Sequence, residues 1–262
     1  MFHDHRGDLN WASLGVLVDI ALGSVTRVST GPGFRSTTLH LDVELTGASS
    51  GGHLVTEAQF VGRSDDSTLK QLICRGLVRS GDKLVASATG QFITTPVDPS
   101  ANQVQFPWIG KNAFDAAIAP TDLDDAERAA LTRCLASEKA STEQHSFIEH
   151  FWCGVPRRGE GRASLTVPVT PHLGNRVGNV HGGLLLGTAA GVASAALPHT
   201  MRLANISAWY VSRGQGPKLT VRSKVLQRGR NVAVVRTQIK GATGKLVLDA
   251  TSQHVHQADA AA

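Results

Sequence analysis

The chain has 262 residues, of which 41% are hydrophobic and 18% charged, so it can bury a large core and is not a disordered chain. Its formal net charge is +5 at pH 7, and the basic residues form no long run and are not interleaved with aromatic ones, which argues against a nucleic-acid groove. Three cysteines without C-x-x-C spacing argue against a disulfide framework and against a zinc site.

The first half of the chain combines one apolar helix with several strands. Residues 13–26 predict a helix with almost no polar face, in which Asp19 is the only charged residue. We expect other structure to wrap such a helix on all sides. Residues 39–45 alternate strictly between apolar and polar side chains, which predicts a half-buried strand. Further strands are predicted at residues 54–61, 69–79 and 84–93.

A polar connector with one helix follows. Residues 96–120 are irregular in pattern, and Thr121-Asp-Leu-Asp124 predicts the start of a helix that continues to about residue 140. Thr121 is expected to cap the free amide of Asp124. We expect the helix to pack on the outside of a sheet through one apolar stripe, which consists of Leu123, Leu131, Cys134 and Leu135.

The second half repeats the order of the first. Residues 184–197 predict another nearly all-apolar helix, followed by strands at 204–211, 219–227, 232–239 and 246–255. Residues 147–170 are expected to supply an opening segment and a first strand. The sequence therefore predicts a duplication, with one unit over residues 1–95, a connector with a helix over 96–140 and a second unit over 141–262.

The segment before the second apolar helix has the pattern of a site. It reads Asn175-Arg-Val-Gly178-Asn-Val-His181-Gly182-Gly183. Glycines at a helix start let a substrate carbonyl approach the free amides there, as an oxyanion hole requires. A tight turn with a solvent-facing histidine is the structural alternative.

The matching segment of the first unit carries an acid instead. Asp19 lies in the middle of its helix, where aspartate has poor helix propensity and a high cost of burial, which favours a functional role. A capped or paired structural acid is the alternative. Nine residues before Asp19 stands Asn10, and nine residues after His181 stands Ala190.

These features together resemble the hotdog-fold acyl-CoA thioesterases, and most closely the phenylacetate-pathway (PaaI-like) type. That type has N-x-x-G-x-x-H-G-G followed by an Asp or Glu nine residues after the His. The resemblance implies an α+β fold, a double hotdog with two antiparallel sheets, each wrapped around a central apolar helix. In the family the site lies between two paired hotdogs, so the His-Gly-Gly end of one helix faces the acid of the partner helix.

The resemblance implies one working site per chain. This composite site would combine Asp19 with Asn175, His181 and Gly182, whereas the other pseudo-site, with Asn10 and Ala190, would be inactive. Asp19 would act either as the general base for water or as a nucleophile that forms a mixed anhydride. Asn175 would hold the water or the thioester oxygen, and His181 with the Gly182 amide would bind the carbonyl.

Four further residues are candidates for substrate binding. Gly178 and Gly183 belong to the motif and are expected to line the substrate. Arg228 and Arg230 lie in a predicted turn and could receive the phosphates of coenzyme A, although an ordinary basic hairpin tip is equally compatible with them.

The sequence thus predicts a thioesterase acting on a small or medium acyl- or aryl-CoA. The alternative is a non-catalytic acyl-CoA-binding or scaffold protein, and a hotdog hydratase is a weaker third hypothesis. We expect no metal and no cofactor apart from coenzyme A as part of the substrate. A polar N-terminus and the lack of about 18 consecutive strongly apolar residues predict a cytoplasmic protein without a membrane partner. We also expect a homodimer of the double units.

Overall fold

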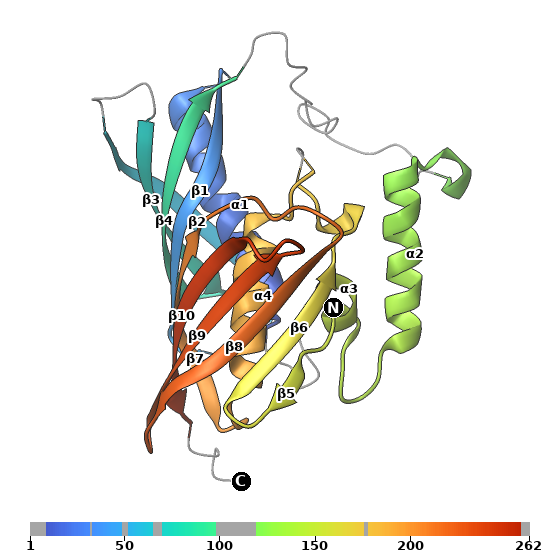
Figure 1. Ribbon diagram of the computed structural model, residues 1–262. Helices are drawn as coiled ribbons and strands as arrows, with labels where there is room; N and C mark the ends of the chain where they lie inside the picture. Colours follow the sequence, from blue (N-terminus) through green and yellow to red (C-terminus); the bar gives the residue numbers. More distant parts are fainter. Residues whose placement is uncertain are drawn as a thin grey trace.

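The two halves of the chain are built alike (Figure 1). This computed structural model describes residues 9–31, 33–48, 52–64, 70–97, 119–175 and 178–257. In the first half, α1 (Trp11–Thr30) is followed by β1 (Phe34–Leu45), β2 (Leu54–Arg63), β3 (Lys70–Ser80) and β4 (Lys83–Pro96). In the second half, α4 (Gly182–Ala195) is followed by β7 (Met201–Tyr210), β8 (Lys218–Arg228), β9 (Val232–Gly241) and β10 (Leu246–His256). The predicted order of one helix and then four strands is confirmed in both halves.

A short set of elements precedes α4. It consists of η1 (Pro120–Asp122), α2 (Asp125–Ala140), α3 (Phe147–Trp152), β5 (Arg157–Gly159), β6 (Arg162–Pro168) and η2 (Pro171–Leu173). The opening segment and first strand predicted for the second half are therefore present, as α3, β5 and β6. Residues 98–118 of the predicted connector lie outside the described residues.

The prediction of two separate sheets is wrong. One antiparallel sheet of ten strands has the order β2-β3-β4-β1-β7-β10-β9-β8-β6-β5. The halves join where β1 pairs with β7, from His40 opposite Trp209 to Glu44 opposite Asn205. Each of these strands would otherwise present a row of unpaired backbone groups at a sheet edge, and the pairing satisfies both rows.

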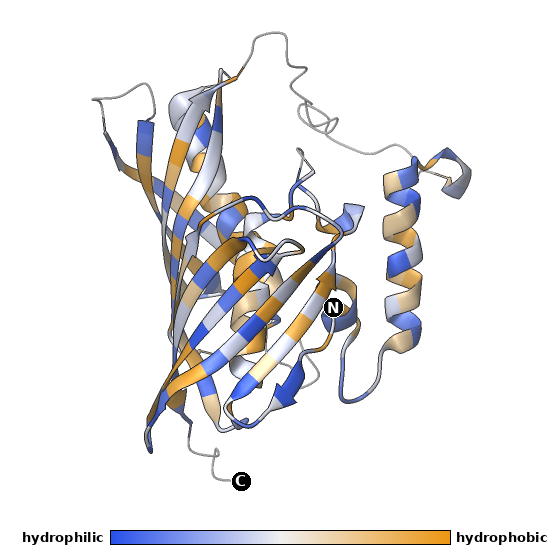
Figure 2. Ribbon diagram, viewed as in Figure 1, coloured by the Kyte–Doolittle hydropathy of each residue, from blue (hydrophilic) through white to orange (hydrophobic). Residues whose placement is uncertain are grey.

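The two apolar helices lie against each other and against this sheet. α1 contacts β1 to β4, and α4 contacts β6 to β10. Figure 2 shows hydrophobic and hydrophilic residues alternating along strands such as β8 and β9, as expected of strands with one buried face. α4 is buried along nearly its whole length. α1 is not wrapped on all sides as predicted, because Ile20 is 52% exposed.

The sequence predicted no segment that could span a membrane, and α1 does not agree with this prediction. α1 is long and apolar enough to cross one, although the core helix of a soluble protein meets the same criterion. Its packing against α4 and four strands accounts for its apolar character in this fold.

Glycines bring α1 and α4 into backbone contact. A Cβ atom at Gly187 would lie 2.3 Å from the Cα atom of Ala12, and one at Gly15 would lie 2.2 Å from the carbonyl oxygen of Gly183. Because any side chain at these positions would push the helices apart, the glycines set the distance between them. They thereby hold the start of α1 against the first half of α4.

Two expectations about α2 are corrected. Its N-cap is Asp124, whose Oδ1 accepts from the Glu127 amide at 2.8 Å, while Glu127 Oε2 accepts from the Asp124 amide at 2.9 Å. Thr121 lies in η1 instead, because Asp-x-x-Glu forms the capping box. α2 packs against α3 and η2 and not on the sheet, and Figure 1 shows it standing to one side.

A buried histidine in β10 makes the stability of the fold dependent on pH. His254 is fully buried, and this burial lowers its pKa to about 4. The unfolded chain, with an ordinary histidine pKa of about 6.5, therefore takes up a proton first as the pH falls. The stability contribution of the neutral side chain is present above the unfolded pKa and is lost as the pH falls toward 4.

We expect this residue to lower the free energy of unfolding by roughly 3 kcal/mol between pH 7 and pH 4. In His254→Leu the decrease should be smaller by that amount. Urea unfolding at pH 7, 5.5 and 4 measures the difference between the two proteins. An equal pH dependence in both would contradict the assignment of the effect to His254.

Candidate active site

Both apolar helices begin with a side-chain cap at corresponding positions. Asn10 Oδ1 accepts from the amides of Ala12 at 3.0 Å and Ser13 at 3.2 Å. His181 is the N-cap of α4, and its Nδ1 accepts from the Gly183 amide at 3.1 Å. The residues that the sequence aligned, Asn10 and His181, therefore occupy equivalent structural positions, each at the start of its helix.

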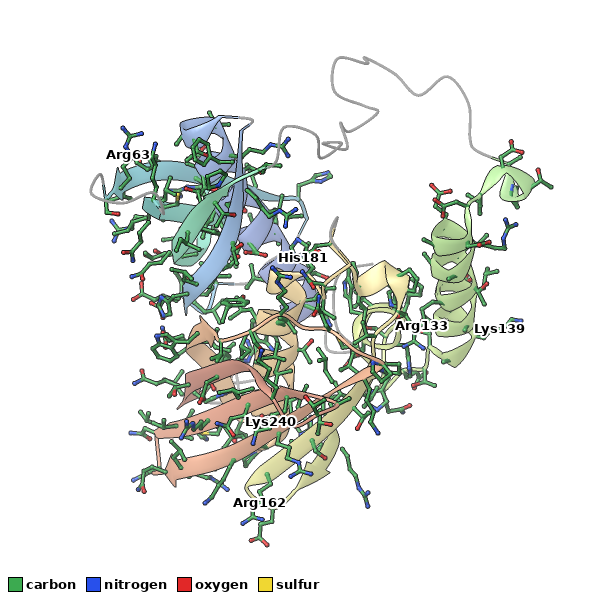
Figure 3. The ribbon with its side chains drawn as sticks, turned by 45° about the horizontal axis from the view of Figure 1, so that its top comes forward. Arg63, Arg133, Lys139, Arg162, His181 and Lys240 are labelled. Atoms are coloured by element: carbon green, nitrogen blue, oxygen red, sulfur yellow. The ribbon has the colours of Figure 1, made fainter. Side chains whose placement is uncertain are left out.

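The carboxylate of Asp19 lies against the first turn of α4. Its Oδ2 accepts from the Gly183 amide at 2.9 Å and lies 3.5 Å from His181 Nδ1. Its Oδ1 accepts from the Thr38 hydroxyl, on β1, at 3.0 Å. A Cβ atom at Gly182 would lie 2.7 Å from Asp19 Oδ2, so a glycine is required there. The structure thus brings Asp19, His181, Gly182 and Gly183 together, and Figure 3 shows His181 where α1 and α4 meet.

The surroundings of Asp19 oppose its ionisation. Only 8% of the residue is exposed. Burial raises the pKa of the Asp19 carboxyl above its ordinary value, and His181, the Thr38 hydroxyl and the Gly183 amide offset part of this increase. A carboxyl group with a raised pKa, beside the positive end of a helix dipole, is suited to exchange protons or to attack a carbonyl.

The hydrogen bonds of His181 depend on its protonation. A neutral imidazole with its proton on Nε2 accepts from the Gly183 amide through Nδ1. A protonated imidazole would instead donate from Nδ1 to the Asp19 carboxylate. His181 therefore links the charge of Asp19 to the geometry of the helix start.

Tyr210 is a site residue that the sequence analysis missed. It ends β7, and its hydroxyl donates to the Gly182 carbonyl at 2.9 Å. Burial and the nearby Asp19 carboxylate raise the pKa of Tyr210 well above its ordinary value, so the hydroxyl remains a donor. Tyr210 is the only tyrosine of the chain, which is the one sequence signal that could have drawn attention to it.

We expect Tyr210→Phe to lower the free energy of unfolding by about 1–3 kcal/mol, because it leaves the Gly182 carbonyl without its donor in a partly buried setting. Chemical unfolding of the native protein and the variant measures this change. A variant as stable as the native protein would mean that water replaces the hydroxyl at no cost.

Asn175 and Gly178 shape the loop before α4. The Asn175 side chain accepts from the Asn179 amide at 3.1 Å, and the Asn175 amide donates to the Asn179 carbonyl at 2.7 Å. Gly178 has a φ of +73°, a conformation that favours glycine, and donates to the Asn175 carbonyl at 3.0 Å. These hydrogen bonds close the loop. The predicted roles of Asn175 in catalysis and of Gly178 in substrate binding stay predictions.

Arg228 and Arg230 lie apart from this cluster. Both are exposed at the turn between β8 and β9. Arg228 pairs with Ala233, which packs with Ala193 and Leu197 at the C-terminal end of α4. The turn is therefore at the opposite end of α4 from His181, and the structure does not bring these arginines to Asp19. Their contact with coenzyme A stays a prediction.

Metal ligands were not expected, and in the part of the chain that the structure describes no group of three or more His, Cys, Asp or Glu side chains is arranged to hold a metal ion. The polar groups around Asp19 are an amide, a hydroxyl and an imidazole.

Comparisons with known proteins agree with the fold. Residues 171–255 match the family model described as the acyl-CoA thioesterase N-terminal domain. No curated protein matches the chain. The tesB protein of Mycobacterium avium subspecies paratuberculosis is similar in structure, with a TM-score of 0.56 and 16% identity over 93% of this chain and 86% of that one. A protein of Lactobacillus plantarum assigned as an oleoyl thioesterase has a TM-score of 0.57 and 10% identity over 98% and 93% of the two chains.

At these identities the structural likeness shows a shared fold. A large antiparallel sheet with packed helices fits the hotdog thioesterases, as the resemblance implied. The family match covers residues 171–255, which contain the His-Gly-Gly motif, and supports a thioesterase domain in this part of the chain.

Proposed function

We propose that this protein is an acyl-CoA thioesterase of the PaaI-like type, built as two hotdog units with a single composite site between them. The observation that carries the proposal is the hydrogen bond between the Asp19 carboxylate and the Gly183 amide, which are 164 residues apart in the chain. It places an acid from one half at the helix N-terminus of the other. The substrate would be a small or medium acyl- or aryl-CoA, and the protein would act in the cytoplasm.

The first amide of α4, that of Gly182, would polarise the thioester carbonyl. By its position this amide has no acceptor within the helix, and the helix dipole there favours negative charge. The Gly183 amide is already bonded to Asp19, so Gly182 is the better oxyanion donor. Because Gly182 has no side chain, a carbonyl can approach its backbone closely.

Asp19 would then supply the oxygen nucleophile by one of two routes. As a general base it would take a proton from water while the water oxygen bonds to the thioester carbon, and the carbon–sulfur bond would break to release the thiolate of coenzyme A. As a nucleophile it would bond to that carbon itself, and water would then hydrolyse the mixed anhydride. In both routes the thiolate leaves with the bonding electron pair and acquires a proton.

The second pseudo-site is expected to be inactive. Its cap residue, Asn10, uses its side-chain oxygen on the amides of Ala12 and Ser13. In place of the acid stands Ala190, which is 2% exposed among apolar neighbours. Neither a nucleophile nor a base is present at that position.

Release of free coenzyme A from short, medium and aromatic acyl-CoAs tests the proposed activity and ranks the acyl groups. The expected result is turnover of at least one class by the native protein. Binding of acyl-CoA without any release of coenzyme A would overturn the proposal and favour the scaffold alternative. Ala190→Asp, which adds a carboxyl group without a matching His-Gly-Gly turn, is expected to gain no second activity.

The raised pKa of Asp19 predicts an acidic limb in the pH dependence of kcat/KM. Activity needs the ionised carboxylate, so it should fall as the pH drops through a pKa that lies above the ordinary aspartate value. Thr38→Val removes a hydroxyl that donates to the carboxylate at 3.0 Å, so it should raise the pKa of Asp19 further and move this limb to higher pH. Rate profiles of the two proteins measure the shift. A limb that stays in place would mean that Asp19 is not the titrating group.

A further inference from the structure

The peptide group between Gly182 and Gly183, at the start of α4, is hydrogen-bonded on both sides. Its carbonyl oxygen accepts from the Tyr210 hydroxyl at 2.9 Å. Its N–H group donates to Asp19 Oδ2, also at 2.9 Å. A chain of hydrogen bonds therefore runs from the end of β7, through this 182–183 peptide, to the carboxylate on α1.

The 182–183 peptide has little stiffness of its own. Both residues that it joins are glycines, whose backbone dihedral angles are the least restricted of any residue. Its N–H group lies in the first turn of α4, where amides have no acceptor within the helix. Because a trans peptide is planar, its C=O and N–H bonds point in opposite directions. A hydroxyl that fixes the direction of the C=O bond therefore also aims the N–H bond at Asp19.

Tyr210 is itself held firmly in place. It pairs with Leu248 of β10, and its side chain packs against the main hydrophobic core. Burial and the negative charge of Asp19 raise the pKa of Tyr210 well above its ordinary value. The phenol therefore keeps its proton, and remains a donor, over the pH range in which a carboxyl group titrates.

Donation to the carbonyl also makes the N–H group of the same peptide a better donor. Hydrogen bonds in a chain polarise one another, by roughly 10–30% per bond. Burial raises the pKa of Asp19, and the Gly183 amide is one of the groups that offset this increase. A weaker Gly183 donor would offset less of it, so loss of the Tyr210 hydroxyl should raise the pKa of Asp19 further.

We propose that Tyr210 is a positioning residue for Asp19, and that it holds the 182–183 peptide in the orientation that stabilises the ionised carboxylate. Its role is indirect, because its hydroxyl bonds to the peptide and not to the carboxylate. The inference rests on the proposed function, in which Asp19 activates water or attacks the thioester. His181 on α4 and Tyr210 on β7 are the titratable groups that face Asp19 within the described ranges, and β1 contributes the Thr38 hydroxyl.

Tyr210→Phe removes the hydroxyl and keeps the aromatic ring. In this variant the acidic limb of kcat/KM should move to higher pH, by less than in Thr38→Val, whose lost hydroxyl bonds the carboxylate directly. Activity at a pH well above the limb should stay close to that of the native protein. A purely structural role of Tyr210 would instead lower activity equally at every pH and leave the limb in place.

Ser212→Ala is the matched control. The Ser212 hydroxyl also donates to a backbone carbonyl, that of Leu246 on β10, at 2.6 Å. The substitution thus removes a comparable hydrogen bond two residues further along the chain, but not one to the 182–183 peptide. It should leave the acidic limb where it is in the native protein.

A fluorinated tyrosine tests the same hydrogen bond in the opposite direction. Tyr210 is the only tyrosine of the chain, so protein produced with 3-fluorotyrosine carries it at this position alone. The fluorine makes the phenol more acidic and hence a stronger donor, while the ring and the hydroxyl remain. The acidic limb should therefore move to lower pH. This protein keeps the inference testable if Tyr210→Phe does not fold.

Carbon NMR of the Asp19 carboxyl measures its pKa without any substrate and separates it from the titration of His181. The signal is assigned by its absence in Asp19→Asn. The pKa of Asp19 should rise in Tyr210→Phe, fall with 3-fluorotyrosine and stay unchanged in Ser212→Ala. An unchanged pKa in the first two proteins would overturn the inference, as would an equal rise in Ser212→Ala. The expected pKa changes in a protein that hydrolyses no acyl-CoA would contradict the proposed function and leave this inference standing.

Discussion

Asp19→Asn is expected to reduce acyl-CoA hydrolysis by about 10²–10⁴-fold, the usual loss when a general base is removed. The asparagine is nearly the same size as the aspartate. Its oxygen can still accept from the Gly183 amide, and its nitrogen can donate to the Thr38 hydroxyl. The substitution thus removes the charge and basicity while the contacts between α1 and α4 persist. Release of coenzyme A under single-turnover and steady-state conditions measures the loss.

Stability provides the control for this variant. Because burial raises the pKa of Asp19, the ionised carboxylate destabilises the folded protein, and this cost grows as the pH rises from the unfolded pKa through the folded one. At pH 7 the asparagine variant should therefore be at least as heat-stable as the native protein. A variant with full activity would refute the role of Asp19, and an unfolded variant would refute the account of its contacts.

Gly187→Ala, in the middle of α4, is expected to cause a large loss of stability. Its Cβ atom would lie 2.3 Å from both the Ala12 Cα atom and the Trp11 carbonyl oxygen, which are backbone atoms that cannot move aside. Overpacking of a core typically costs about 1–3 kcal/mol, and a clash with the backbone of α1 should reach or exceed the upper value. Urea unfolding followed by circular dichroism measures the change.

Gly191→Ala is the matched control, one helical turn further along the same helix. Its added methyl group meets nothing within 4 Å. Alanine is about 0.5–1 kcal/mol more favourable than glycine in a helix interior, so this variant should be slightly more stable than the native protein. Equal destabilisation by the two substitutions would show that the distance between the helices is not set by Gly187.

The regular elements could be predicted from the sequence because they follow local patterns. The alternation in residues 39–45 and the long apolar segments have counterparts in β1, α1 and α4. Features that depend on distant segments were missed. The pairing of β1 with β7 joins residues more than 160 positions apart. Nothing in the sequence of either strand indicates whether its free edge pairs with another strand of the chain or is covered by a helix or loop.

The candidate site, too, could be predicted only in part from the sequence. A lone charge in an apolar helix made Asp19 conspicuous, and the structure places it beside His181 and Gly182. Thr38 and Tyr210 reach the same place only through the packing of β1 and β7, which no spacing in the sequence reveals. Arg228 was assigned by charge alone, and charge does not indicate at which end of α4 a turn lies.

The ladder between β1 and β7 joins two halves that a single gene encodes in tandem. In a homodimer of identical subunits, one codon change alters both copies of a surface, so each copy must retain everything that the symmetric pair requires. A tandem chain removes this constraint, because a change at Ala190 leaves Asp19 untouched. The covalent linkage thereby lets the two halves diverge, so that Asp19 and the His-Gly-Gly turn at residues 181–183 can each persist in one half alone.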